Sequence, residues 1–386
     1  MIILWSLLLG VFLGVPAVYY LYMRRFSRRD WNLQRDLSYS PSVTVIVPMH
    51  NEEKTIRFKL ENLMKVEYPK DKLQIIVVND SSEDQSVPIV TDFQKSNGQM
   101  NIDLIDNKGQ RGKTQSLNLA LQHADGEVIV VSDADCFWSP QALLNGIEFL
   151  SDPSVGAVTG LELLLNPKET WVTETEILYN DVVHTMRIGE SKFYSTIIFQ
   201  GGFGAYKKPL IEQFDVEADD SGTALSIVQK GERTLLVPEV TYFTMSPRTL
   251  KGKVTTKLRR ASNLVRIWLR CLNLFVRAKI VLPKRIFLPE AYLHIFNPFV
   301  FLLLVAVTFL VLFEIPLFSL LLVAFLVVAL LFGKLRTMTV ELIQDQLFLL
   351  GAIFSLTLKQ ETRLWTTEEA PRDLLKRETL EAKGLV

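Results

Sequence analysis

The sequence predicts an α/β domain built on a doubly wound parallel sheet, with apolar membrane segments before and after it. Between residues 43 and 131, apolar strand-like runs alternate with helical stretches, which is the pattern of parallel sheets covered by helices. Long apolar stretches near both ends have the length that a bilayer crossing needs. A chain of 386 residues has room for such a domain together with a membrane part.

Composition narrows the classes of partner. Lys and Arg number 42, and Asp and Glu also number 42, so the formal net charge is zero. No bulk positive field therefore indicates a nucleic-acid partner. The two cysteines, Cys136 and Cys271, exclude a disulfide framework and a zinc site. A reduced, cytosol-facing domain fits this cysteine usage.

Residues 2–23 carry no charge and are long enough to span a bilayer. A signal peptide is the competing interpretation. Against it, no basic residue precedes the apolar run and no clear small-residue cleavage site precedes the charges that follow. Arg24, Arg25, Arg28 and Arg29 follow at once. By the positive-inside rule, they place the domain over 24–245 in the cytosol and the N-terminus outside.

The first half of this domain predicts strands at 43–49, 73–79, near 101–106 and at 128–131. Each is followed by a polar loop, and ligands of open α/β sheets bind beyond the carboxyl ends of strands. The last strand leads directly into Asp133-Ala-Asp135. Two carboxylates at this position can hold one Mg²⁺ or Mn²⁺ ion together with substrate phosphates. The alternative is a plain exposed turn, in which Asp is also common.

The second half is less regular. Residues 155–165 read as a strand, 170–190 as a helix, and 199–208 as a glycine-rich segment that ends in lysines. Asp219 and Asp220 open a further helix, where a capping role is the alternative to a catalytic one. A strand at 233–237 follows.

Region 246–285 contains an amphipathic helix. Its apolar positions recur at spacings of three and four, and its other faces are basic. This pattern favours a helix in the membrane interface; a core-facing helix with a solvated basic face is the alternative. The apolar positions are Leu250, Val254, Leu258, Ala261, Val265, Trp268, Leu272 and Phe275, and the basic ones include Lys253 and Lys257.

Region 286–334 predicts a transmembrane hairpin, with spans at 291–313 and 317–332 separated by Glu314-Ile-Pro316. Residues 335–358 are apolar but contain Glu341 and Asp345, which are costly in a lipid-facing helix. We expect this helix to lie in the interface or to pack on the hairpin, with a third span as the alternative. The tail, 359–386, is charged and is expected on the cytosolic side; its basic residues include Arg363, Arg372, Lys376 and Arg377.

Six segments within residues 41–265 resemble, in order, the motifs of inverting family 2 glycosyltransferases with the GT-A fold, a Rossmann-like nucleotide-diphospho-sugar transferase domain. They are VTVIVPMHNEE (43–53), VVNDSSED (77–84), GQRGKTQSLNLAL (109–121), SDADC (132–136), GGFGAYKK (201–208) and DDSGTALSIVQKGERTLLVPE (219–239). The membrane segments resemble those of the polysaccharide-synthase branch, which includes hyaluronan, chitin and cellulose synthase-like enzymes.

The resemblance implies a role for each matched residue. The donor is a UDP- or GDP-sugar, and Mg²⁺ or Mn²⁺ is held by Asp135 with Asp133. Gly202 and Gly204 lie on the acceptor side. Asp220 is the general base, with Asp219 beside it. The donor-binding set is Pro48, Asn51, Glu52, Asp80, Lys113, Asp133, Arg259 and Arg260.

These roles agree with the chemistry that the reaction needs. A divalent ion stabilises the negative charge of a departing diphosphate, and Lys113 can contact phosphate as a point charge. An attacking hydroxyl must lose its proton to a carboxylate within hydrogen-bond reach. Inversion follows from a single direct displacement.

The sequence departs from the family pattern at three places. KLRRAS stands at 257–262, where the synthase branch carries Q-x-x-R-W, so neither the Gln nor the Trp is present. This disfavours a processive, polymer-extruding mechanism. Asn79 replaces the usual first Asp of its motif, and Gly222 replaces the acid that normally follows the base by two. Neither change removes a predicted metal ligand.

The sequence therefore predicts a multi-pass enzyme of the cell membrane that transfers a sugar to a lipid-linked or glycan acceptor at the cytosolic face. A processive polysaccharide synthase is one alternative. A non-catalytic nucleotide-sugar-binding scaffold is another. A nucleotidyltransferase is a third, although HNEEKT after the first strand lacks the glycine-rich, basic signature of that class.

Overall fold

The computed structural model describes residues 1–109, 112–167, 169–216, 218–247, 249–358, 372 and 375–386. The chain forms two compact units, which are described separately. The sheet unit comprises Phe26–Glu169, Arg187–Arg248 and Arg363–Val386. The helical unit comprises Met1–Arg25, Thr170–Met186 and Thr249–Thr362.

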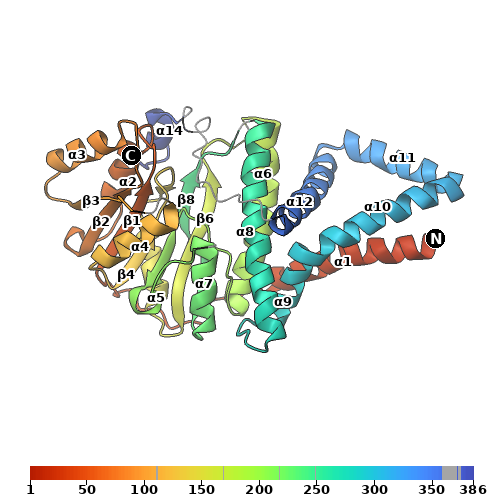
Figure 1. Cartoon of the computed structure of the whole chain (residues 1–386), viewed down its shortest axis with the longest axis horizontal. Coiled ribbons are helices and arrows are strands. Elements are labelled where there is room, and N and C mark those ends of the chain that lie inside the picture. Colours follow the sequence, from red (N-terminus) through yellow and green to blue (C-terminus); the bar gives the residue numbers. More distant parts are fainter. Residues whose placement is uncertain (110–111, 168, 217, 248, 359–371, 373–374) are drawn as a thin grey trace. The chain divides into compact units, whose positions relative to one another are not determined.

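The sheet unit contains one mixed sheet (Figure 1). Strands β1, β2, β3 and β4 are parallel, which confirms the predicted parallel half. Strand β7 is antiparallel to β4 and to β6, and this reversal makes the sheet mixed. In spatial order the described strands are β3 (Asn101–Asp106), β2 (Leu73–Asn79), β1 (Val43–Met49), β4 (Val128–Val131), β7 (Gly204–Lys207), β6 (Val155–Leu164), β8 (Arg233–Thr244) and β5 (Phe137–Trp138).

Apolar side chains cover both faces of the central strands. On β1, Val45 and Val47 belong to one buried cluster and Ile46 to the other, because successive side chains of a strand point to opposite faces. Helices α2 (Ile56–Met64), α3 (Ser86–Ser96) and α5 (Ala142–Leu150) contribute apolar residues to the first cluster. Helices α4 (Lys113–His123) and α7 (Asp219–Gln229) contribute to the second. This two-sided burial explains why these strands read as continuous apolar runs.

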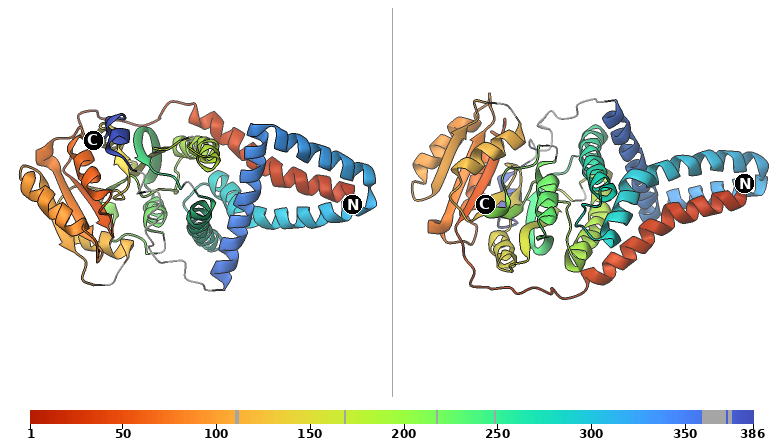
Figure 2. Two further views of the ribbon diagram at one scale, coloured as in Figure 1. Left: turned by 90° about the horizontal axis from the view of Figure 1, so that it is seen from above. Right: turned by 60° about the horizontal axis from the view of Figure 1, so that its bottom comes forward.

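The helical unit contains α1 (Ile2–Ser27), α8 (Leu250–Val276), α10 (Asn297–Glu314), α11 (Pro316–Leu331) and α12 (Gly333–Thr357). It also holds α9 (Lys284–Ala291), the π-helical turn Tyr292–Phe296 and part of α6 (Trp171–Phe193). Helices α1, α10 and α11 run side by side (Figure 2). Trp5 joins them, since its Nε1 donates to Thr308 Oγ1 at 2.9 Å and its ring meets that of Phe318.

Three described helices are long and apolar enough to cross a membrane: Ile2–Ser27, Lys284–Glu314 and Leu335–Thr357. The predicted break at 314–316 separates α10 from α11. Helix α11, predicted as the second arm of the hairpin, has 16 residues, which at 1.5 Å per residue give about 24 Å. Most of the predicted tail, 359–371 and 373–374, lies outside the described residues.

Helix α8 packs part of its apolar stripe against α12 within the helical unit. Val265 and Ala261, in the middle of the apolar stripe, are buried against Leu349 and Ala352 of α12, while Val254 is exposed. Lys253, expected on a solvated basic face, is buried and pairs with Glu341. The acids of α12 and the lysines of α8 thus compensate each other, which the linear sequence does not reveal.

Candidate active site

The acidic turn Ser132–Cys136 joins β4 to β5 at the carboxyl edge of the parallel strands. The Asp133 amide donates to the Gly201 carbonyl at 2.8 Å, and the Cys136 amide donates to the Asp133 carbonyl at 3.2 Å. These bonds fix a tight loop from which the Asp133 and Asp135 side chains remain partly exposed. The turn therefore presents both carboxylates, as the D-x-D pattern predicts.

The donor atoms of this turn fit a hard divalent ion. One carboxylate oxygen from each of Asp133 and Asp135 and the Cys136 sulfur lie within 4.8 Å of one another. Burial, followed by the two neighbouring carboxylates, raises the pKa of the Cys136 thiol well above its usual range. The thiol keeps its proton, so the two aspartates are the ligand candidates. Mg²⁺ and Mn²⁺ are commonly bound through one or two carboxylates, with phosphate and water at the remaining positions.

Lys59 supports the acidic turn through hydrogen bonds. The sequence pattern alone did not predict this role. Lys59 Nζ donates to Ser132 Oγ and to the Cys136 carbonyl, both at 2.7 Å, and lies 4.5 Å from the centre of the Trp138 ring. Burial lowers its pKa to about 7. One signal was available in the sequence: Ile56, Lys59, Leu60 and Leu63 follow the spacing of a buried helix face, and the lysine interrupts it.

Lys113 forms ion pairs with three carboxylates, one of which belongs to the acidic turn. Its Nζ lies 2.8 Å from Asp133 Oδ1, 3.0 Å from Asp219 Oδ2 and 3.6 Å from Asp220 Oδ2. Burial lowers the pKa of Lys113, but the three carboxylates outweigh burial and raise it well above its usual value. Lys113 therefore links the predicted metal site to the predicted general base.

Asp219 and Asp220 begin α7 without capping it. The N-cap position is Ala218, and no side chain accepts a capping hydrogen bond there. Burial, then the nearby charge of Asp219, raises the pKa of Asp220 to about 7, although Lys113 opposes the shift. A carboxylate with a pKa near neutrality is suited to accept a proton. A Cβ at Gly222 would lie 2.4 Å from the carboxyl carbon of Asp215, so that acid occupies the space beside Gly222.

The glycine-rich segment that precedes β7 packs closely against the side chains of the site. A Cβ at Gly201 would lie 2.2 Å from Asp133 Oδ2 and 2.7 Å from Lys113 Nζ, so only glycine fits there without movement. The Gly202 carbonyl accepts from Trp138 Nε1 at 2.7 Å. Cβ atoms at Gly202 and Gly204 would collide with Tyr242 and Tyr206. Gly202 and Gly204, predicted on the acceptor side, thus make close packing contacts next to the acidic turn.

The loops after β1 and β2 carry the remaining predicted donor-binding residues of the sheet unit. Pro48 is buried within β1, beyond the last residue that pairs with β4. Asn51 adopts φ 53° and accepts from the Glu83 amide at 2.9 Å. Asp80 accepts from Asn107 Nδ2 and from the Gly112 amide, both at 2.9 Å. Asp80 therefore holds the loop that leads into Lys113.

Glu52 is buried, and its carboxylate meets a residue from the far end of the chain. Arg372 Nη2 lies 2.6 Å from Glu52 Oε1 and 3.1 Å from Asp135 Oδ2. Thr55 Oγ1 donates to Glu52 Oε2 at 2.7 Å. Burial, and then the charge of Asp135, raises the pKa of Glu52 to about 8 although Arg372 opposes the shift. Nothing in the local sequence places Arg372 here, because 237 residues separate it from Asp135.

Arg259 and Arg260, predicted to bind the donor, lie on α8 in the helical unit, and both are exposed. The sheet unit contains the charged cluster around the acidic turn, which consists of Lys113, Arg372, Glu52, Asp133, Asp135, Asp219 and Asp220.

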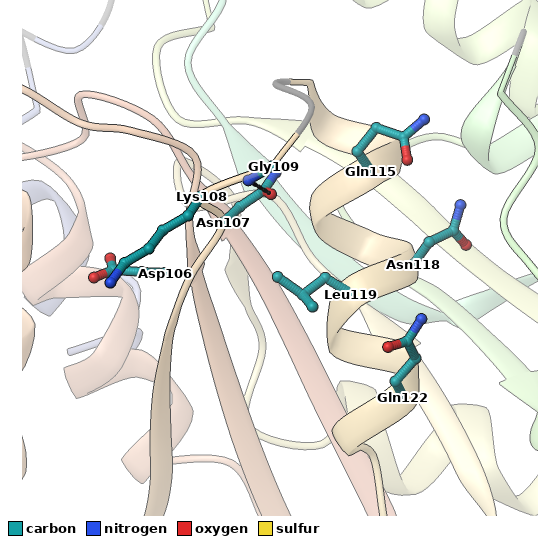
Figure 3. A pocket seen from close by; sticks show the side chains of 8 residues that line it. All are labelled: Asp106, Asn107, Lys108, Gly109, Gln115, Asn118, Leu119 and Gln122. Carbon is teal, nitrogen blue, oxygen red and sulfur yellow. Dashed lines mark hydrogen bonds between the residues drawn. The ribbon is translucent and has the colours of Figure 1, made fainter.

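Two polar pockets open beside the strand-end loops. One, of about 340 Å³, lies between the β3–α4 loop and α4, with Gln115, Asn118 and Gln122 along one side of that helix (Figure 3). None of the acids of the cluster lines it. The other, of about 300 Å³, is lined by Asn51, Glu53, Lys54, Glu83, Asp84 and Arg372, and so adjoins the predicted donor loops.

The fold and the site together define a glycosyltransferase of the GT-A class. The family model described as glycosyl transferase family 2 matches residues 44–214. The solved mannosyltransferase PcManGT from Pyrobaculum calidifontis, in complex with GDP-Man and Mn²⁺, superposes with a TM-score of 0.79 and 31% identity. That match covers 92% of this chain and 99% of the other. The chain belongs to glycosyltransferase family 2, and it is a glycosyltransferase.

Two curated relatives agree with this assignment. The protein named "Probable glycosyltransferase YdaM" of Bacillus subtilis (strain 168) is 28% identical over 260 residues. Poly-beta-1,6-N-acetyl-D-glucosamine synthase of Staphylococcus aureus (strain COL) is 24% identical over 268 residues. These matches span 64% and 67% of this chain, and 61% and 64% of the respective relatives.

Proposed function

We propose that this chain is a membrane-bound, metal-dependent inverting glycosyltransferase that moves a sugar from a nucleotide-sugar donor to a lipid-linked or glycan acceptor at the cytosolic face. The observation that carries the proposal is the pairing of two carboxylate groups through Lys113. Asp133 belongs to the acidic turn, and Asp219 and Asp220 open α7. A donor-phosphate site and a proton acceptor thereby lie side by side.

In this mechanism the acceptor hydroxyl attacks the anomeric carbon while the bond from that carbon to the diphosphate breaks. Asp220 takes the hydroxyl proton, and the nucleoside diphosphate leaves with the bonding electrons. Asp219 and Lys113 hold Asp220 in place, and Lys113 offers a positive charge to the phosphates. Asp133 and Asp135 would hold a divalent ion, which would supply further positive charge to the departing diphosphate.

GDP-mannose is the first donor to test, because the structural relative that shares 31% identity was solved with GDP-Man and Mn²⁺. UDP-N-acetylglucosamine is the second, since one curated relative is named for the synthesis of an N-acetylglucosamine polymer. Transfer of single sugars is proposed over processive synthesis, because KLRRAS at 257–262 lacks the Gln and Trp of Q-x-x-R-W.

The membrane assignment rests on the apolar helices of the helical unit. Helices α10 and α11 expose large apolar side chains, among them Phe309, Phe313, Leu320 and Leu321, as lipid-facing helices do. We propose that α1 and the α10–α11 hairpin span the bilayer, that α8 lies in the interface, and that α12 packs on the hairpin. The catalytic domain then faces the cytosol.

The decisive test is donor-dependent release of nucleoside diphosphate by the purified protein with Mn²⁺. We expect Asp135→Ala to abolish release and to weaken Mn²⁺ binding, with a thermal unfolding profile close to that of the wild type. Chelation should inactivate the wild type reversibly. Full activity in excess chelator would refute the metal assignment, and release of pyrophosphate instead would indicate nucleotidyl transfer.

A further inference from the structure

The C-terminal residues 375–386 dock onto the sheet unit. Leu380, Leu385 and Val386 are buried in a cluster with Phe137 and Leu165. Around this cluster, Arg377 Nη2 lies 2.7 Å from a carboxylate oxygen of Glu61 on α2. The chain end is therefore an integral part of the catalytic domain.

Asn62 joins this chain end to the strand that follows the acidic turn. Its Nδ2 donates to the Leu385 carbonyl at 2.8 Å and to the Trp138 carbonyl at 2.9 Å, and its Oδ1 accepts from the Trp138 amide at 2.8 Å. Trp138 is two residues beyond Cys136. One buried side chain thus holds the C-terminal anchor against the strand that follows the acidic turn.

Arg372, just before this anchor, reaches the donor side of the site. Its Nη2 contacts Glu52 and Asp135, and the side chain lines the 300 Å³ pocket that Asn51, Glu53 and Asp84 also line. Its side chain is 12% exposed. Because two carboxylates hold Arg372 beside this pocket, its charge is fixed in position more firmly than that of a solvated surface arginine.

We propose that Arg372 is a donor-binding residue, supplied by the C-terminal segment, that holds the diphosphate of the nucleotide sugar. The proposal rests on the function proposed above. Lys113 already forms ion pairs with three acids, Asp219 and Asp220 among them. Arg372 pairs instead with Asp135 of the acidic turn and with Glu52 of the loop after β1. A planar guanidinium can bind phosphate oxygens bidentately, and Glu52 keeps the group oriented while it does so.

The same contacts allow a competing role, in which Arg372 neutralises Asp135 and keeps the metal and the donor out. The two roles predict opposite effects of removing the guanidinium. Loss of a phosphate ligand weakens binding of a nucleoside diphosphate, while loss of an internal competitor strengthens binding of both the metal and the nucleotide.

The test uses the full-length protein in detergent with saturating Mn²⁺. Dissociation constants for GDP and UDP are measured by calorimetry for the wild type, Arg372→Ala and Arg372→Lys, with guanosine and uridine as phosphate-free probes. Lys376→Ala is the matched control, because Lys376 is exposed on the same segment and its loss changes the charge equally. Thermal unfolding without nucleotide verifies that each variant is folded.

We expect Arg372→Ala to weaken binding of the preferred diphosphate by about 10- to 100-fold. Arg372→Lys should lose less, Lys376→Ala should stay within about twofold, and the nucleosides should bind equally to all four proteins. If a folded Arg372→Ala protein binds the diphosphate as tightly as the wild type does, the proposal is wrong and Arg372 only forms a structural ion pair. Tighter binding of the diphosphate by Arg372→Ala would overturn the proposal and establish the competing role. Failure of the wild type to bind GDP or UDP would overturn the proposed function itself.

Discussion

At the scale of single residues, the proposed mechanism gives Asp220 the role of general base and Asp219 only a positioning role. Asp220→Asn keeps the size of the side chain but cannot accept a proton, so turnover should fall by about 10²–10⁴ with little change in donor affinity. Asp219→Asn should cost less, because Asp219 contacts Lys113 and only helps to position the base. Turnover at saturating acceptor and donor affinity are the measurements. If Asp219→Asn is inactive while Asp220→Asn remains active, Asp219 is the general base in place of Asp220.

The raised pKa of Asp220 predicts a pH dependence. The base works only when ionised, and its pKa is about 7 in place of the usual 3.8. Turnover should therefore fall as the pH drops below about 7, approaching a tenfold loss per pH unit, and level off above it. The residual turnover of Asp220→Asn should not show this decline below pH 7. A turnover profile that stays flat from pH 5 to 8 in the wild type would contradict the assignment.

Lys59 hydrogen-bonds to the acidic turn that carries the proposed metal ligands, so we expect its loss to affect metal binding. Lys59→Met removes both hydrogen bonds that hold Ser132 and Cys136. Loss of such supporting contacts typically weakens metal binding by about 10- to 100-fold, and we expect Mn²⁺ affinity to fall within that range. Lys65→Met, an exposed lysine on the same segment, is the control. Equal Mn²⁺ affinity for both variants would show that Lys59 serves only the stability of the core.

At the scale of elements, α6, α8 and α12 are joined by a buried charge network. Lys253 pairs with Glu341 and lies 3.5 Å from Glu176, and Lys257 lies 2.6 Å from Glu341. Breaking one partner of a buried pair leaves an uncompensated charge, at a cost of about 3–5 kcal/mol.

Lys253→Met and Glu341→Gln should therefore each lower the unfolding temperature in detergent, and the double variant should lose less than the sum of the two. Lys251→Met, an exposed position on α8, is the control. Strictly additive losses would mean that the two side chains do not stabilise each other.

At the scale of the whole molecule, the docked chain end constrains the membrane topology. Residues 375–386 pack on the same unit as Phe26 and Trp31. In the proposed membrane arrangement, the chain therefore crosses the bilayer an even number of times between Arg248 and residue 375. The α10–α11 hairpin satisfies this condition, and so does the pair α10 and α12.

Cysteine labelling distinguishes the two arrangements. With the hairpin, substitutions at Arg28, Gly333 and Lys376 should label from the cytosol and one at Ile315 from outside. The two native cysteines are buried and provide a low background. Labelling of position 333 from outside would make α12 the second crossing and would leave α11 on the outer side.

The sequence by itself determined the parallel strands, the acidic turn and the family, because each depends on residues close together in the chain. Fully buried strands read as apolar runs, and Asp133 and Asp135 are neighbours on one strand end. Only the tertiary structure decided which distant charges meet. Lys59, Arg372 and the Lys253–Glu341 pair depend on contacts across 73, 237 and 88 residues. A buried charged side chain is stable only beside a side chain of opposite charge. The sequence shows which residues are charged, but it does not show which distant residues pair with them.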